Sequence, residues 1–275
     1  MSTKVLVFGS TGRQGGATVD ALLLKGGFEV HAIVRNPDGG SGQALKARGV
    51  LLHKGDFKSR PSMEAAMRDS GATMVFLFTQ YHPFKNSAKA EQAQGISALD
   101  AIAAVNADAY VVFASVAAAE KAPAAVKHFH SKVAIEAHLK ASSIKRWFIL
   151  RPAAFYENLD DPANGNPLKK GTVKMLGVAS TEVPWIACAD IGKAAVAAFA
   201  SPDAWLGKTV TLCGFRYTGT QVAEAMTEVA RAPTPRYQRR RARNPTLAST
   251  ANPTPDRLRL FPRACRPSPH TPSRE

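Results

Sequence analysis

The sequence predicts an α/β protein with a doubly wound parallel sheet and a small C-terminal α/β lobe. Two observations support this fold class. Short β-rich apolar runs alternate with helical patterns over the first 150 residues, and a cluster of glycines follows the first of these runs, where a helix should begin. At 275 residues, the chain is long enough for one large domain or two small ones. A mini-protein and a fully disordered chain are therefore excluded.

Each βα unit combines a strand-like run with the helical pattern that follows it. Lys4 to Gly9 (KVLVFG) predicts a buried strand, and the helix from Thr11 to Leu24 should end at Gly26–Gly27. The further strands expected here cover 29–34, 50–54, 73–78, 109–114 and 146–151, and the further helices cover 41–48, 60–69, 87–105 and 126–141. Parallel units in this order wind right-handed, so ligands bind outside the carboxyl ends of the strands where the strand order reverses.

From Pro152 onwards, the pattern changes to loops rich in Gly and Pro. The elements expected after this point are strands at 173–177, 183–187 and 208–212 and helices at 190–200 and 218–230. This part is too small to fold alone. We therefore expect one domain over 1–151 and a small substrate or partner lobe over 152–231 that rests on its sheet.

The last segment, 232–275, has a different composition. It contains ten arginines, no lysine, two acidic residues and nine of the 18 prolines, so it carries +8 of the net charge of +15. Such a segment cannot bury enough apolar surface to offset chain entropy, and we expect it to be disordered. Three origins stay open: a frame-shifted end of a GC-rich gene, a plain solvated tail, and a nucleic-acid-binding arm around Arg239 to Arg243.

The sequence also bears on compartment and metal content. No stretch reaches the roughly 18 consecutive apolar residues of a membrane span. The start, MSTKVLVFGSTG, lacks the order of regions found in a signal peptide. We therefore expect a cytoplasmic protein, with the nucleus as a second compartment, and no membrane partner. The three cysteines show no paired spacing, so no metal site is expected.

Gly9, Gly12 and Gly15 form a GxxGxxG pattern between the first strand and the first helix. In a dinucleotide-binding Rossmann fold, the first glycine allows a tight turn, the second lets the backbone approach the pyrophosphate, and the third packs the helix against the strand. The helix N-terminus adds free N–H groups and the positive end of its dipole. The residues of the expected pyrophosphate loop are Gly9, Thr11, Gly12, Arg13, Gln14 and Gly15. The alternative is an ordinary glycine-rich turn.

The residue after the second strand selects the cofactor. An acid at this place would bind the ribose 2′-OH of NAD and repel the 2′-phosphate of NADP, but this chain has Arg35. We expect Arg13 to project beside the same pocket, so that two guanidiniums pair with one phosphate. This predicts binding of NADP(H), with NAD(H) bound more weakly; the alternative is two solvated arginines. Asp56, after the third strand, either accepts from the adenine amino group or caps the next helix.

Taken in order, the runs TGRQG, IVRNP, GD, KVAIE, RPAAFYEN and VPWIACADIG resemble the NmrA-like branch of the atypical short-chain dehydrogenase/reductases. The resemblance covers roughly residues 3–230. It implies a Rossmann domain that binds NADP(H) and a small C-terminal lobe that covers the nicotinamide. The family ordinarily continues with helices past position 230, where this chain departs into its Arg/Pro-rich tail.

Typical members of that superfamily use Ser, Tyr and Lys, with the Tyr four residues before the Lys on one helix face. Lys132 and Ser115 fit the Lys and Ser places, and His128 occupies the place of the Tyr. By this resemblance, Lys132 would hold the nicotinamide ribose. His128 is either a general acid one helical turn from Lys132 or a packing histidine. The i,i+4 spacing also predicts a weak ion pair between Lys132 and Glu136.

Two further groups of residues are expected at the nicotinamide half of the cofactor. Thr79, Gln80 and Tyr81 follow the fourth strand at the carboxyl edge of the sheet. The resemblance places Phe155 and Asn158, which follow the sixth strand, beside the nicotinamide. For Phe155, packing in the core of the lobe is the alternative.

These expectations lead to three hypotheses of function. The first is an NADP(H)-binding redox sensor whose dinucleotide controls association with a protein partner, because an intact nucleotide site lies beside an incomplete proton-transfer site. The second is an NAD(P)H-dependent reductase of quinone-like acceptors, in which water or His128 supplies protons after hydride transfer. The third, nucleic-acid binding, depends on the basic tail alone. The fold by itself does not separate the first two.

Overall fold

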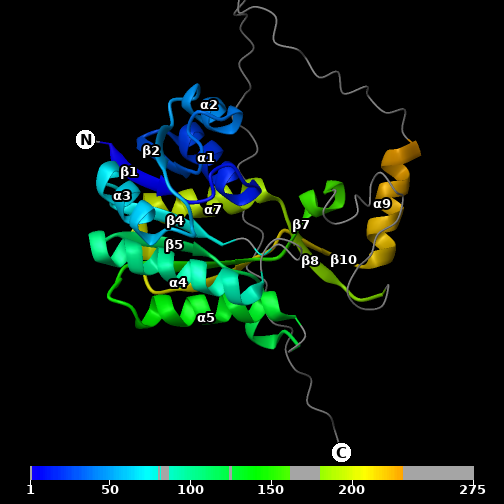
Figure 1. Ribbon diagram of the computed structural model, residues 1–275. Helices are drawn as coiled ribbons and strands as arrows, with labels where there is room; N and C mark the ends of the chain where they lie inside the picture. Colours follow the sequence, from blue (N-terminus) through cyan, green and yellow to red (C-terminus); the bar gives the residue numbers. More distant parts are fainter. Residues whose placement is uncertain (1, 80, 82–86, 124–125, 162–179, 232–275) are drawn as a thin grey trace, which may run out of the picture.

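The computed structural model describes residues 2–79, 81, 87–123, 126–161 and 180–231. A seven-stranded parallel sheet lies at its centre, with the strand order β3-β2-β1-β4-β5-β6-β9 (Figure 1). The seven strands are β1 (Thr3–Val7), β2 (Phe28–Val34), β3 (Leu51–Lys54), β4 (Met74–Phe78), β5 (Tyr110–Ala114), β6 (Trp147–Pro152) and β9 (Thr209–Leu212). The order reverses between β1 and β4, which confirms the doubly wound Rossmann-like fold and marks the crevice where such sheets bind ligands.

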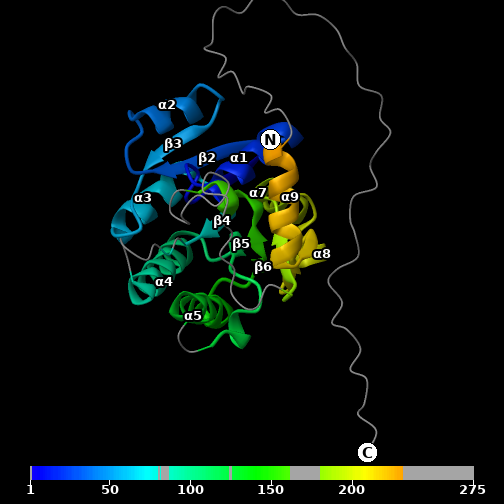
Figure 2. The same cartoon turned by 90° about the vertical axis from the view of Figure 1, so that its right-hand side faces the viewer.

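Helices cover both faces of this sheet. The main helices are α1 (Arg13–Lys25), α3 (Arg60–Ser70), α4 (Ala88–Val105), α5 (Lys127–Ala141) and α7 (Cys188–Ala200), and the short ones are α2 (Gly40–Lys46), α8 (Pro202–Trp205) and η1 (Ala119–Lys121). Figure 2 shows α1 and α7 on one side of the sheet and α4 and α5 on the other. Strand side chains alternate between the two cores. Val5 and Val7 belong to the core under α1 and α7, whereas Leu6 belongs to the core under α3, α4 and α5.

The predicted element boundaries agree with the structure to within two residues for every expected element that it describes. The agreement follows from local signals such as Gly26, which ends α1 in a conformation with a φ of +69°. Two expectations lie outside the described residues: the strand at 173–177 and the tail at 232–275.

The chain beyond β6 contributes to two sheets. A three-stranded sheet of order β10-β8-β7 and the helix α9 lie beside the carboxyl ends of the large sheet (Figure 1). Their bounds are β7 (Ala154–Phe155), η2 (Tyr156–Asp160), β8 (Val183–Ile186), β10 (Phe215–Tyr217) and α9 (Gly219–Arg231). However, α7 and β9, which the sequence analysis assigned to the C-terminal lobe, belong with the large sheet. β9 pairs with β6 in parallel. α7 packs closely on α1, because Gly192 has no side chain to separate it from the carbonyl of Ala17.

Candidate functional site

The glycine loop between β1 and α1 has no room for side chains at two of its three glycines. Gly9 adopts a φ of +64°, and a Cβ atom on it would overlap the ring of Phe78 at the end of β4. A Cβ atom on Gly15 would overlap the carbonyl of Gly9, so this glycine packs α1 against the loop, and not against the strand as expected. Gly12 is the N-cap residue of α1, and its N–H donates to Gly9 O at 2.9 Å. The loop therefore presents bare backbone at the start of α1.

A cavity of about 310 Å³ lies between the glycine loop, the end of β2 and α2. The residues that line it are Thr11, Val34, Arg35, Asn36, Gly39, Gly40, Ser41 and Gly42. Arg35 is exposed and thus supplies a cation to this cavity. The structure brings together two of the residues that were predicted to bind the cofactor, Thr11 and Arg35.

Arg13 does not line that cavity. Its Nη1 atom lies 3.3 Å from Asp161 Oδ2 and donates to Asn158 Oδ1 at 3.4 Å. The expectation that Arg13 and Arg35 share one pocket is therefore wrong for this arrangement. The reason is that the segment after β6 brings a carboxylate and an amide oxygen to the start of α1. Asn158 reaches the glycine loop through this contact.

Asp56 closes the turn that leads into α3. Its Oδ1 atom accepts from the N–H of Lys58 at 2.9 Å, and its own N–H donates to Ser62 Oγ at 3.0 Å. The N-cap of α3 is Ser59, whose hydroxyl accepts from the N–H of Ser62. Asp56 therefore organises the turn before the helix and does not cap it.

Lys132 lies in a buried network between α4, α5 and the end of β4. Its Nζ atom is 3.0 Å from Glu91 Oε1 and donates to Thr79 O at 2.5 Å and to Thr79 Oγ1 at 2.7 Å. Glu91 is fully buried and also accepts from Thr79 Oγ1 at 3.1 Å and from Ser131 Oγ at 2.6 Å. Burial lowers the pKa of Lys132, and the Glu91 carboxylate opposes this shift. The expected pair of Lys132 with Glu136 is not formed.

Glu136 instead pairs with a cation from the sheet. Arg151, near the end of β6, donates from Nε to Glu136 Oε1 at 2.9 Å and from Nη2 to Glu136 Oε2 at 2.5 Å. Arg151 Nη2 also pairs with Glu120. The i,i+4 prediction was wrong because each buried charge of α5 faces a different element, where an opposite charge with better geometry is available.

His128 lies one turn before Lys132 and stacks on Tyr81, with ring centroids 4.9 Å apart and an interplanar angle of 13°. Burial lowers the pKa of His128, and the nearby Glu91 opposes this shift. Of the residues expected after β4, the structure places Thr79 and Tyr81 against α5, whereas Gln80 lies outside the described residues.

Two buried polar atoms near the expected dinucleotide have no hydrogen-bond partner in the described structure: Gln14 Oε1 at the start of α1 and Ser115 Oγ just after β5. An unpaired buried polar atom is costly, and a bound ligand or water removes that cost. Together with the bare glycine loop and the cavity at Arg35, these atoms fit a nicotinamide dinucleotide laid across the carboxyl ends of β1, β4 and β5.

The segment after β6 is held by packing and by one cap. Phe155 packs against the core of the large sheet under α7, and not in a separate core of the lobe. Tyr156 stacks on Trp185 with ring centroids 5.9 Å apart. Glu157 Oε1 accepts from the N–H of Cys188 at 2.8 Å, which fixes this segment to the N-terminus of α7. Burial raises the pKa of the Cys188 thiol to about 12.

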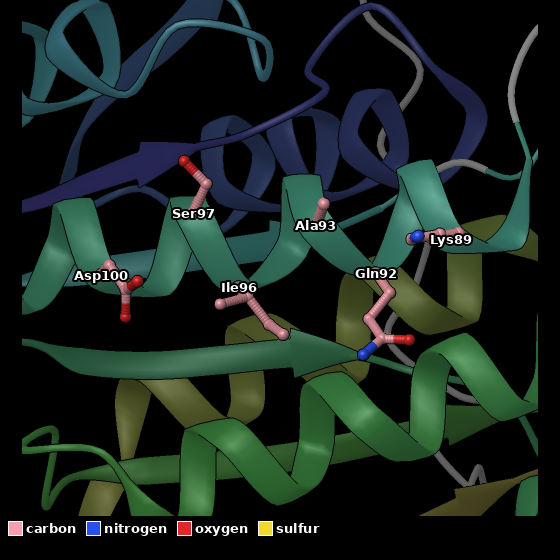
Figure 3. Close-up of a pocket in the computed structure, with 6 residues that line it drawn as sticks. All are labelled: Lys89, Gln92, Ala93, Ile96, Ser97 and Asp100. Carbon is pink, nitrogen blue, oxygen red and sulfur yellow. The ribbon is translucent and has the colours of Figure 1, made fainter.

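A second, open pocket of about 620 Å³ lies along the outer side of α4, and the described residues that line it all come from that helix (Figure 3). These residues are Lys89, Gln92, Ala93, Ile96, Ser97 and Asp100. It does not include the glycine loop or the buried lysine. Within the described ranges, no group of three or more metal-ligating side chains is found, and no helix there has the length and apolarity to cross a membrane.

Glu91 was not among the residues expected at the site. Helical spacing offers a signal, since Glu91 shares the buried stripe of α4 with Gly95, Ala98, Leu99 and Ile102. A lone acid on an apolar stripe requires a buried cation nearby, but the spacing does not say which one.

Residues 1–240 match the model of the NmrA-like family. The chain is 44% identical over 71 residues to the NmrA-like family domain-containing oxidoreductase notA of Aspergillus sp., which covers 26% of this chain and 21% of that protein. The match thus spans about a fifth of the length of this relative.

Two solved structures are similar in fold. One is the Citrobacter sp. triphenylmethane reductase complexed with NADP(H), with a TM-score of 0.69 and 20% identity over 82% of this chain and 75% of that one. The other is NmrA, a negative transcriptional regulator in complex with NADP, with a TM-score of 0.68 and 20% identity over 83% of this chain and 72% of that one.

Proposed function

The chain belongs to the NmrA-like family, and we propose that it binds NADP(H) and acts as a redox sensor whose bound dinucleotide controls association with a partner protein. The glycine loop, with the Arg35 cavity beside it, supports the binding of the dinucleotide. The arrangement around Lys132 and His128 supports a sensor in preference to a catalyst.

The dinucleotide would be held at two places. The backbone of Gly9, Gly12 and Gly15 would hold the pyrophosphate, since the bare loop and the α1 N-terminus offer N–H groups to an anion. Arg35 and Thr11 would hold the adenosine end in the cavity of about 310 Å³. The guanidinium would pair with a 2′-phosphate through charge-assisted hydrogen bonds, which NAD lacks. NAD(H) would therefore bind more weakly.

In this arrangement Lys132 is not free to donate to a substrate. Lys132 has three N–H groups and three acceptors around them, and the ring of His128 is stacked on Tyr81. A binding protein has no need of a proton donor, because its output is the difference in partner affinity between its nucleotide states. The observation that carries the sensor proposal is that all three N–H groups of Lys132 already have acceptors within the protein.

A reductase of quinone-like acceptors is the second candidate. The unpartnered hydroxyl of Ser115 favours it, because this buried donor could bind the oxygen of a carbonyl acceptor. When bound, a reduced nicotinamide would supply a hydride, and a quinone acceptor would take the one further proton from water. One relative that shares 44% identity over 71 residues carries the name oxidoreductase.

Steady-state oxidation of NADPH in the presence of a panel of quinones tests the choice. The sensor proposal expects tight binding of NADPH, measured by its fluorescence, without turnover above the uncatalysed rate. Turnover that is lost in Ser115→Ala while NADPH still binds would replace the sensor by the reductase. Failure to bind NADPH, NADP or NAD would overturn both.

A further inference from the structure

We propose that Glu91 is a positioning residue of the nicotinamide end of the site, which holds Lys132 on Thr79 and thereby fixes Thr79 at the end of β4. This inference rests on the proposed binding of NADP(H). It assigns Lys132 a role through Thr79 and not a direct bond to the nicotinamide ribose.

Glu91 is built into the protein as the centre of a network. It is fully buried on α4, and its two carboxylate oxygens face three donors, on β4's end and on α5. Ser131 donates to Oε2 at 2.6 Å, while Thr79 at 3.1 Å and Lys132 at 3.0 Å share Oε1. These contacts hold the carboxylate and the ammonium group of Lys132 in one fixed arrangement.

Lys132 has no donor left for a ligand in this arrangement. An ammonium group has three N–H bonds, and its acceptors here are Glu91 Oε1, Thr79 O and Thr79 Oγ1. A ribose hydroxyl would have to displace one of them. Displacing Glu91 would leave a buried carboxylate without its counter-charge, so the ribose is expected to meet Thr79 and its neighbours instead.

A second contact holds the same segment to α5. Tyr81, two residues after Thr79, stacks on His128, one helical turn before Lys132. Lys132 and His128 therefore bind the chain after β4 at two successive points, Thr79 and Tyr81. Because Thr79 directly follows β4 at the point where the strand order reverses, its position contributes to the shape of the site.

A double-mutant cycle with two ligands tests the proposal. NADPH spans the whole site, whereas adenosine 2′,5′-bisphosphate occupies only the end at Arg35. We expect Glu91→Gln and Lys132→Met each to weaken NADPH binding about tenfold or more and to leave the bisphosphate unchanged. The double variant should bind NADPH no more weakly than either single variant, because both act through Thr79.

The pH profile supplies a readout that a merely structural role would not move. In Glu91→Gln, Lys132 loses the carboxylate that opposes the effect of burial on its pKa, so its ammonium should deprotonate at lower pH than in the parent. As the pH is raised, the NADPH affinity of the variant should therefore begin to fall earlier than the affinity of the parent. Glu91 also raises the pKa of His128, so the two profiles are compared in a His128→Gln background, where this titration is absent.

Asp100 is an acidic residue on the outer side of the same helix, so Asp100→Asn is the matched control. This variant should bind NADPH like the parent. The proposal would be overturned if Lys132→Met weakened NADPH binding more than Glu91→Gln and if the two losses added in the double variant. Such a result would show a direct contact between Lys132 and the ribose. If Glu91→Gln does not fold, Thr79→Val takes its place in the cycle and must be non-additive with Lys132→Met. If the unmodified protein does not bind the bisphosphate at all, the proposed function itself fails.

Discussion

Arg13 Nη1 lies 3.3 Å from Asp161 Oδ2, so that an ion pair joins the start of α1 to the segment after β6. The side chains are 38% and 25% exposed, and a pair of this kind contributes at most about 1 kcal/mol. This contact draws Arg13 away from the cavity of about 310 Å³, where Arg35 remains as the lining cation. The two arginines should therefore differ in their effects on cofactor choice.

Replacing Arg35 by Glu should abolish or reverse the preference for NADP(H) over NAD(H). The expected cost is about 1.5–3 kcal/mol of binding free energy for NADPH, the value of hydrogen bonds to a charged group. Titrations of NADPH and NADH measured by fluorescence would check this. Arg13→Gln is the control and should leave the ratio of the two affinities nearly unchanged; equal affinities in the parent would remove the argument.

The glycines of the loop should separate binding from folding. Gly15→Ala places a methyl group on the carbonyl of Gly9 and should lower the free energy of unfolding by about 1–3 kcal/mol. Gly12→Ala meets its nearest atoms at 3.3 Å, so the fold should survive while dinucleotide binding weakens. Urea denaturation and NADPH fluorescence report the two effects. Unchanged NADPH affinity in a folded Gly12→Ala would show that the loop is only a turn.

The buried pair of Arg151 and Glu136 should matter for stability. Arg151→Met leaves the carboxylate of Glu136, whose side chain is 3% exposed, without its bidentate partner. We expect a loss of about 3–5 kcal/mol in the free energy of unfolding by urea denaturation. Lys140→Gln removes a longer contact to the same carboxylate, at 3.9 Å, and should cost at most about 1 kcal/mol. Similar losses in both variants would contradict this ranking.

Stability should fall as the solution is acidified below the ordinary histidine pKa of 6.5. Burial lowers the pKa of His53, and the neighbouring His31 adds to the effect; burial also lowers the pKa of His128. The folded protein therefore binds fewer protons than the unfolded chain in this range. The resulting stability is present above pH 6.5 and is lost as the pH falls through the folded-state pKa values.

Urea denaturation midpoints measured above and below pH 6.5 test this. His53→Gln and His128→Gln should each reduce the difference between the two midpoints. An acid-induced loss that is equal in the parent and in both variants would assign it to other groups.

The sequence by itself determined the features that depend on neighbouring residues. Periodicity and glycine positions predicted the βα units to within two residues, and the GxxGxxG pattern predicted the bare loop at Gly9 and Gly15. Arg35, expected to select the cofactor, lines the cavity at the end of β2, and its part in binding stays a prediction. Such features follow from local backbone geometry, which a short run of residues specifies.

Only the tertiary structure decided which charges pair and which sheet each late element joins. Spacing along α5 paired Lys132 with Glu136, but the fold gives Lys132 to Glu91 and Glu136 to Arg151. In the same way, β9 adds to the large sheet, beside β6. A buried charge is stable only beside an opposite charge in the protein interior. The elements that supply this charge come from distant parts of the chain, so helical spacing alone does not identify the partner.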